Sequence, residues 1–130
     1  MRLLLDTSLL IEGGIPAQSE VAISTVSIAE LHFGLLVAKD EEARGLRASR
    51  LGLVEARFPD PLAVDDAVAR EWGRLKAAVA RRGGRPRRRE ADLAIAATAN
   101  VHRAALLTHD AADLAIIEDL VDVRLGDGLL

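Results

Sequence analysis

The sequence contains no cysteine and no tyrosine, and it has only two lysines and four prolines. Without cysteine, a disulfide framework and thiolate chemistry are both excluded, and a reducing compartment is allowed. No apolar run approaches the roughly 20 residues that a membrane span needs. Arg2 stands before a leucine run as in a signal peptide, but Asp6 and Glu12 interrupt the apolar region and no small-residue cleavage site follows. We therefore expect a cytoplasmic protein that does not enter a membrane.

The residues that are present fit one globular domain spanning residues 1–130. Half of them are hydrophobic and 28% are charged, which excludes a disordered chain. The net charge is only −3, but its distribution is uneven. Six of the fifteen arginines lie between positions 81 and 89, in a segment that Gly83, Gly84 and Pro86 predict to be a loop or flap within the domain.

Short apolar runs alternate with longer segments of helical periodicity. The continuous run Leu3–Leu5 is typical of a strand covered on both faces. We predict strands at 3–5, 21–24, 105–107 and 121–125, and helices at 7–12, 25–38, 40–57, from 65 onward, from 90 or 91 to 101, and 110–117. Thr7 and Ser8 are suited to cap the first helix, and Thr25 and Ser27 the second. The alternation predicts an α/β fold with a parallel sheet.

Two carboxylates follow predicted strands directly. Asp6 ends the first strand, and Asp110 follows the strand at 105–107, with Asp113 three residues later. In an open parallel sheet, ligands bind outside the carboxyl ends of the strands, so both positions suit chemistry. The alternative is that Asp6 only caps the next helix. Asp110 and Asp113 should repel each other unless a positive group lies near them.

Two further carboxylates lie on predicted helices. Glu30 has the small residues Ser27 and Gly34 one turn away on either side, which would let a ligand approach it; a solvated glutamate is the alternative. Asp92 stands in the first turn of an alanine-rich helix, where the helix dipole alone would favour it. If these helices face the strand ends, four carboxylates converge.

Such a cluster, without a buried lysine or arginine, would need a cation to neutralise it. Ligation by oxygen atoms alone selects a hard divalent ion, Mg²⁺ or Mn²⁺. Carboxylate-bound ions of this kind hydrolyse phosphodiesters by acidifying a water and stabilising the leaving oxygen. None of the three histidines shares a helix face at metal-ligand spacing with another, and only His109, beside Asp110, is a minor candidate.

Four segments together resemble the PIN domain family, and within it the VapC ribonuclease toxins. They are DTS at 6–8, SIAE at 27–30, DLAIAATA at 92–99 and THDAADL at 108–114. Leu114 stands where the family usually has an aromatic residue, and Asp110 where many members have asparagine. The resemblance implies a three-layer α/β/α sandwich around a mostly parallel sheet of four to five strands.

The resemblance also implies a Mg²⁺- or Mn²⁺-dependent endoribonuclease that cleaves tRNA, rRNA or mRNA. Asp6 and Asp92 would be the principal metal ligands, and Glu30 would complete the site or orient water. Asp110 or Asp113 would be the further ligand, with the choice between them open. Secondary candidates from the same motifs are Ser8 and Thr108.

Partners are implied as well: a VapB-type antitoxin, a homodimer, and operator DNA bound only through the antitoxin. An amphipathic antitoxin helix could dock in a groove, although core packing better suits most of its candidate residues, which are Trp72, Phe33, Leu35, Leu36 and Leu46. The scarcity of aromatic residues predicts little stacking on RNA bases.

Arginine binds phosphate in bidentate fashion, so the basic segment before Asp92 could hold the RNA backbone. The candidates are Arg81, Arg82, Arg85, Arg87, Arg88 and Arg89. The alternative for these arginines is a solvated loop whose charges pair with acids elsewhere. The alternative functions are a non-catalytic PIN-like binding module and another PIN nuclease, acting on DNA or in RNA maturation. A phosphoacceptor receiver fits poorly, since it needs a lysine near the last strands.

Overall fold

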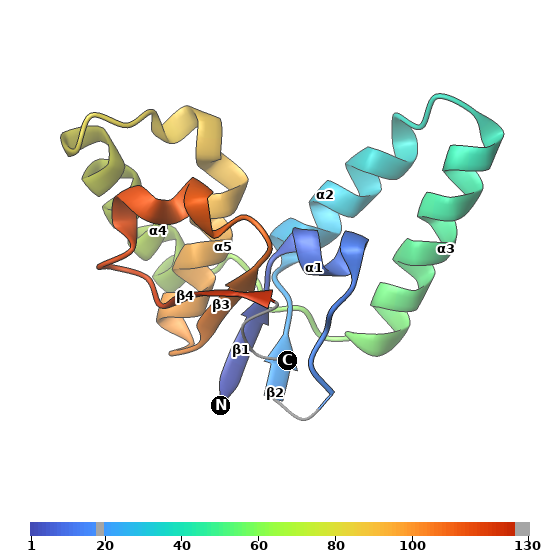
Figure 1. The fold of residues 1–130 in the computed structure, drawn as a ribbon, viewed down its shortest axis with the longest axis horizontal. Coiled ribbons are helices and arrows are strands. Elements are labelled where there is room, and N and C mark those ends of the chain that lie inside the picture. Colours follow the sequence, from blue (N-terminus) through green and yellow to red (C-terminus); the bar gives the residue numbers. More distant parts are fainter. Residues whose placement is uncertain (18–19, 127–130) are drawn as a thin grey trace.

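A computed structural model of the protein describes residues 1–17 and 20–126 (Figure 1). The last four residues of the predicted domain therefore lie outside the described residues. The elements follow in the order β1 Arg2–Leu5, α1 Thr7–Glu12, β2 Glu20–Ala22, α2 Thr25–Leu36, α3 Glu41–Arg57, α4 Asp66–Arg81, the 3₁₀ helix η1 Pro86–Arg89, α5 Glu90–Val101, β3 Ala105–Thr108, the 3₁₀ helix η2 Ala111–Ile117, and β4 Val123–Leu125.

The four described strands form one parallel sheet in the order β2-β1-β3-β4. In the centre, Leu5 of β1 is level with Leu107 of β3, and the backbone N–H of Asp6 continues the pairing by donating to the carbonyl of Leu107 at 2.9 Å. This register places the residues that follow β1 and β3 side by side. The predicted α/β fold with a parallel sheet is confirmed.

Helices cover both faces of the sheet, because side chains of a strand point alternately to either side. Leu4 and Leu106 enter a core with α4, α5 and η2, whereas Leu3, Leu5 and Leu107 enter a second core with α1, α2 and α3. This is the expected three-layer arrangement. Among the described residues, no helix is both long and apolar enough to span a membrane.

Helix α5 is almost wholly buried, from Leu93 to Ala99. Its many alanines allow it to approach the sheet and α4 closely, and the buried hydroxyl of Thr98 is satisfied by donating to the carbonyl of Ala94 at 2.8 Å. Because α5 is packed tightly in the core, the position of its first turn is fixed relative to the strand ends. This turn carries Asp92.

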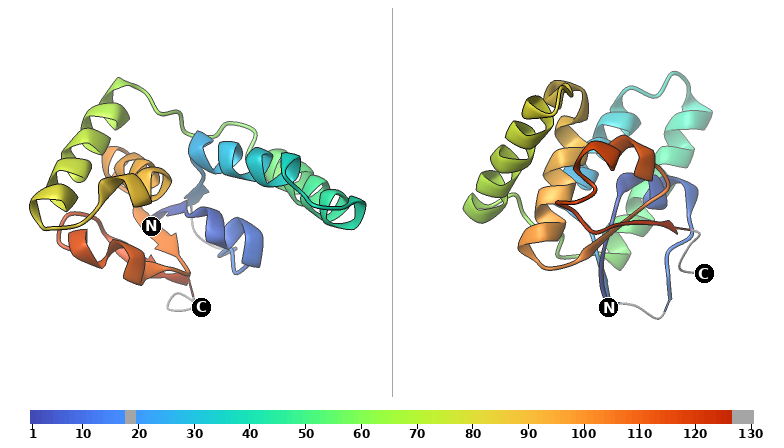
Figure 2. Two further views of the ribbon diagram at one scale, coloured as in Figure 1. Left: turned by 90° about the horizontal axis from the view of Figure 1, so that it is seen from above. Right: turned by 60° about the vertical axis from the view of Figure 1, so that its left-hand side comes forward.

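Helices α2 and α3 form an antiparallel pair that extends away from the sheet as an arm, which is clearest from above (Figure 2). Asp40 caps α3 by accepting from the backbone N–H of Ala43 at 2.8 Å. The helix runs unbroken through Gly45 and Gly52, which are both exposed. We call this pair the α2–α3 arm.

Several predicted boundaries are wrong. The second strand ends at Ala22 because Ser24 turns to cap α2, its hydroxyl accepting from the backbone N–H of Val26 at 3.0 Å; the predicted caps were one and three residues later. Helix α2 ends at Leu36, the segment after Asp110 is a 3₁₀ helix, and β4 begins only at Val123. The predicted loop at 83–89 contains η1, which leads directly into α5.

Candidate functional site at the carboxyl ends of the central strands

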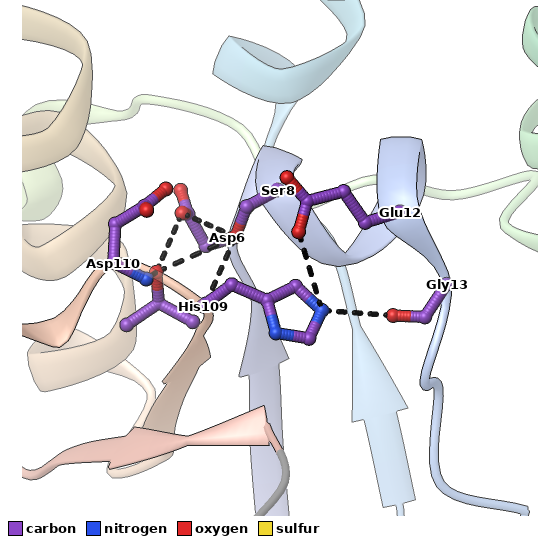
Figure 3. A network of polar contacts seen from close by, with 7 residues as sticks. Asp6, Ser8, Glu12, Gly13, His109 and Asp110 are labelled. Atoms are coloured by element: carbon purple, nitrogen blue, oxygen red, sulfur yellow. Dashed lines mark hydrogen bonds and ion pairs between the residues drawn. The ribbon is translucent and has the colours of Figure 1, made fainter.

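Asp6 and Thr108 meet where β1 and β3 end. The carboxylate oxygen Oδ2 of Asp6 accepts two hydrogen bonds, from the hydroxyl of Thr108 at 2.8 Å and from that of Ser8 at 2.9 Å (Figure 3). Both hydroxyls are directed towards Asp6 because their own oxygens are occupied by backbone N–H groups. The backbone N–H of His109 donates to the hydroxyl oxygen of Ser8 at 3.1 Å, and the backbone N–H of Asp110 donates to the hydroxyl oxygen of Thr108 at 3.0 Å.

This network corrects one reading of the sequence. Asp6 occupies the N-cap position of α1, but its side chain makes no capping hydrogen bond. The hydroxyls expected to cap α1 are used elsewhere, that of Ser8 on Asp6 and that of Thr7 on Glu30. In the part of the chain that the structure describes, Oδ1 of Asp6 accepts no hydrogen bond, so this oxygen is open to a ligand.

Glu30 reaches the same region from α2. Oε1 of Glu30 accepts a short hydrogen bond, 2.6 Å, from the hydroxyl of Thr7. Because Thr7 gives its proton to Glu30, the 2.9 Å contact between Thr7 and Ser27 has Ser27 as donor. The sequence analysis did not include Thr7 among the site candidates. Two sequence features could have indicated it: Thr7 directly follows Asp6, and Ser27 and Glu30, which it contacts, are one helical turn apart.

The negative charges of the other carboxylates act on Asp92. Its pKa is raised from 3.8 to about 6, and burial is the largest cause. The other causes that raise this pKa are the negative charges of Asp6, Glu30 and Asp113, while Arg89 acts in the opposite direction. Asp6, Glu30 and Asp113 therefore lie close enough to Asp92 for their charges to raise its pKa, and we call these four residues the acid cluster.

Asp110 and Asp113 occupy different places. Both line a small hollow together with Asp6 and Asp92. Asp113 alone of the pair contributes to the raised pKa of Asp92, and it forms an ion pair of 3.3 Å with Arg89. Asp110 and Asp113 were expected to repel each other unless a positive group lay near them, and Arg89 is that group. Asp110 is exposed at the N-cap position of η2.

The histidines stay outside the cluster. The ring of His109 turns away from Asp6 and lies against the end of α1, with Nε2 3.0 Å from the carbonyl oxygen of Gly13 and 3.9 Å from Glu12 (Figure 3). His32 lies on the α2–α3 arm, 3.3 Å from Glu55. Neither histidine is in position to act with the carboxylates.

The donor set suits a hard divalent cation, because it consists of carboxylate and hydroxyl oxygens. Partial neutralisation by one arginine leaves mutual repulsion, which the raised pKa of Asp92 expresses. Within residues 1–17 and 20–126, no three Asp, Glu or His side chains are already arranged around a single ion. Thr7 donates to Oε1 of Glu30 and Arg89 pairs with Oδ1 of Asp113, so the second oxygen of each carboxylate is still able to bind a cation.

The six candidate arginines fall into three groups. Arg82 binds Asp119 at 2.6 Å and the carbonyl of Ile116 at 2.8 Å, as the solvated-loop alternative expected. Arg85, Arg88 and Arg89 instead line a hollow of about 390 Å³ between η1 and η2. Arg81 and Arg87 are exposed and lie outside that hollow, so the six candidates do not form one surface.

The aromatic residues also differ from one another. Phe58 is buried, and Trp72 packs half-buried against the core between the sheet and α4 and α5. Phe33 is 68% exposed and lines a hollow of about 420 Å³ with Glu30 and Ile11. Core packing is therefore wrong for Phe33, and also for Leu36 and Leu46, which are 69% and 65% exposed, whereas Trp72 packs against the core.

A second apolar hollow, of about 470 Å³, lies between α1 and α3 and shares Ile11 with the first. Large apolar side chains of the α2–α3 arm are exposed nearby, among them Leu36, Leu46 and Leu53. Together with Phe33 and Ile11, these residues form what we call the apolar arm surface.

Comparison with known proteins places these features in a family. The model of the PIN domain matches residues 3–118. Ribonuclease VapC8 of Mycobacterium tuberculosis H37Rv is 41% identical over 103 residues, covering 75% of this chain and 90% of the relative. Ribonuclease VapC5 of the same strain is 36% identical over 106 residues, or 81% and 74% of the two chains. A crystal structure described as VapBC-5, a member of the VapBC family of toxin-antitoxin systems from Mycobacterium tuberculosis, superposes with a TM-score of 0.79 at 35% identity, covering 95% and 96%.

Proposed function

The chain belongs to the PIN domain family, and from this premise we propose that it is an endoribonuclease, the toxin of a toxin–antitoxin pair of the VapBC kind. The observation that carries the proposal is the acid cluster at the carboxyl ends of β1 and β3, where the pKa of Asp92 rises to about 6 among three other carboxylates. Storing so much like charge in one place costs stability, so a role beyond folding is called for.

We propose Mg²⁺ or Mn²⁺ as the cofactor, held by Asp6 and Asp92, with Asp110, Asp113 and Glu30 as the remaining candidate ligands. When bound, such an ion supplies positive charge that acidifies water and offsets the charge developing on the phosphate. The chain itself fixes the ligands: Ser8 and Thr108 hold one oxygen of Asp6 and leave the other open.

Glu30 is proposed to orient the attacking water or to take its proton. The hydroxyl of Thr7 holds Oε1, which leaves Oε2 for a proton or a water. A carboxylate held by one strong hydrogen bond keeps its orientation during the reaction, so little reorganisation is needed. Glu30 is half-buried, which shields such a water from exchange.

RNA is the proposed substrate, and the cytoplasm is the proposed location. The cluster repels polyanions, so binding needs separate positive charge, and Arg85, Arg88 and Arg89 provide it beside the carboxylates. Which of tRNA, rRNA or mRNA is cleaved follows from contacts beyond the cluster.

A VapB-type antitoxin is the proposed partner, and the apolar arm surface is its proposed docking site. Leu53 is 74% exposed and Phe33 68%, in contrast with the buried apolar residues of both cores. The hollow lined by Phe33 also contains Glu30, so a segment lying on the surface would reach the acid cluster. A homodimer, and contact with operator DNA only through the antitoxin, remain our predictions.

The proposal is tested by incubating total cellular RNA with the purified protein in Mg²⁺, in Mn²⁺ and in EDTA, next to the variants Asp6→Asn and Asp60→Asn. Asp60 is an exposed loop carboxylate far from the cluster in sequence and serves as the matched control. We expect cuts at a few discrete sites that need the metal, persist in Asp60→Asn and disappear in Asp6→Asn. Cleavage that survives EDTA or Asp6→Asn would contradict the metal mechanism, and absence of cleavage by antitoxin-free protein would favour a non-catalytic binding module.

A further inference from the structure

The hollow of about 390 Å³ between η1 and η2 adjoins the acid cluster. Asp113 and Leu114 line both this hollow and the smaller one that contains Asp6 and Asp92, so the two share a wall. Any molecule held in the larger hollow, which we call the η1–η2 pocket, therefore lies next to the carboxylates.

The walls of the η1–η2 pocket are apolar and its rim is cationic. Among its apolar lining residues, Ala112, Ala115 and Ile116 are exposed, whereas Val79, Leu93 and Leu114 are almost wholly buried. Gly84 also lines the pocket, and a Cβ atom there would come within 2.7 Å of Val79 and 2.8 Å of Ile116. Exposed apolar side chains beside arginines suit a ligand that has both an apolar ring system and an anionic group.

Two of the three arginines on the rim are available to a ligand. Arg89 already pairs with Asp113 at 3.3 Å, and Arg82, outside the pocket, pairs with Asp119. In contrast, the side chains of Arg85 and Arg88 form no ion pair or hydrogen bond with any residue in the described part of the chain. Arginines left without a carboxylate at the edge of a cavity are well placed to bind phosphate.

The size of the pocket selects among anionic aromatic ligands. About 390 Å³ is at the lower end of the range for small-molecule sites, enough for one nucleotide and too small for a duplex. Proteins that read RNA commonly take up unpaired bases that are turned out of the strand.

We propose that the η1–η2 pocket binds one unpaired nucleotide of the RNA, next to the bond that is cut. The base lies against Ala112, Ala115 and Ile116, and Arg85 and Arg88 hold the phosphates of that nucleotide. Arg89, through its ion pair with Asp113, ties the pocket to the acid cluster. The inference rests on the proposed function.

The test measures binding in EDTA, so that cleavage plays no part. A fluorescein-labelled single-stranded 12-mer of 2′-O-methyl RNA is titrated with the full chain, and anisotropy reports Kd. The variant Arg85→Ala/Arg88→Ala removes two arginines of the rim. The matched control Arg81→Ala/Arg87→Ala removes the same charge from exposed arginines of the same segment outside the pocket.

We expect the rim variant to raise Kd about 10-fold or more, because charge-assisted hydrogen bonds to phosphate are lost, and the control to raise it by less than about 3-fold. Equal losses in the two variants would overturn the proposal in favour of general electrostatic attraction. Melting curves confirm that both variants fold.

A second variant leaves the charge unchanged. Ala115 lines the pocket and is exposed on η2, so Ala115→Trp fills the space without disturbing a core. We expect weaker binding of the single strand; binding as tight as in the wild type would place the base elsewhere. Ala112→Trp, also exposed and on the same wall, replaces this variant if it does not fold.

Two further arms separate the alternatives. Competition by AMP, GMP, CMP or UMP at micromolar concentration would overturn the proposal in favour of a free nucleotide, whereas competition only by oligonucleotides supports it. If the protein binds the RNA through the pocket but cleaves no RNA, the proposed function is wrong and the proposed role of the pocket is supported. If it cleaves RNA and both double variants behave alike, the proposed function stands and the pocket fails.

Discussion

Replacing Asp92 by asparagine should stabilise the metal-free protein. In the folded chain the pKa of Asp92 is about 6, compared with 3.8 for an ordinary aspartate, because the carboxylate is buried among other negative charges. Ionisation of Asp92 is therefore harder in the folded than in the unfolded chain, and Asp92→Asn removes that cost while nearly preserving the shape of the side chain.

The sign and the pH range follow from proton linkage. Below about pH 4 Asp92 is protonated in both states and contributes nothing. Between about pH 4 and 6 the unfolded chain loses the proton first, so the stability of the wild type falls as pH rises, and above about pH 6 the loss is complete. A difference of about two pH units corresponds to ~3 kcal/mol. Because Asp92 is only half-buried and solvent screens its charge, we expect about 1–3 kcal/mol.

The assay is urea unfolding in EDTA at pH 4 and at pH 8, followed by circular dichroism. Wild type and Asp92→Asn should have nearly equal free energies of unfolding at pH 4, and the variant should be more stable at pH 8. Asp60→Asn is the control and should show no such difference. A variant that is equally or less stable than the wild type at pH 8 would refute the reasoning. Saturating Mg²⁺ should stabilise the wild type and leave Asp92→Asn nearly unchanged.

Three other substitutions test the hydrogen bonding and packing of residues that support the site. Thr108→Val removes the hydroxyl that donates to Asp6, so we expect a loss of about 1–2 kcal/mol in urea unfolding together with slower RNA cleavage. Gly84→Ala places a Cβ 2.8 Å from Ile116, and overpacking should cost about 1–3 kcal/mol, measured as a lower Tm. Leu4→Ala creates a cavity under α5 and should cost about 2–5 kcal/mol, or abolish folding at 37 °C; a change below about 1 kcal/mol would contradict the assigned core.

The layers of the fold could be predicted from the sequence because they depend on burial. The run Leu3–Leu5 is apolar at every position, which requires cover on both faces, and the structure buries all three side chains. Element ends were harder to predict because they depend on single hydrogen bonds. Ser24, Thr25 and Ser27 are all plausible caps for α2, and only the fold of the preceding chain makes Ser24 the one that caps it.

In the candidate site, too, some features could be predicted from the sequence and others depend on individual contacts. Asp6 could be placed from the strand that precedes it. That Asp113 rather than Asp110 acts on Asp92 could not be read from spacing, because it depends on η2 being a 3₁₀ helix and on the ion pair with Arg89. The different surroundings of Arg82 and Arg88 were likewise hidden, since the segment between Arg81 and Arg89 reads as one basic run whatever its partners are.

The register of the central strands has a consequence for synthesis of the chain on the ribosome. Asp6 and the hydroxyl that orients it, on Thr108, are 102 residues apart in the sequence, and β1 cannot pair with β3 until both have been translated. At about 5–20 residues per second, a growing chain carries Asp6 without that partner for roughly 5 to 20 seconds. The acid cluster also needs Asp92 and Asp113, so it is incomplete until residue 113 has been translated.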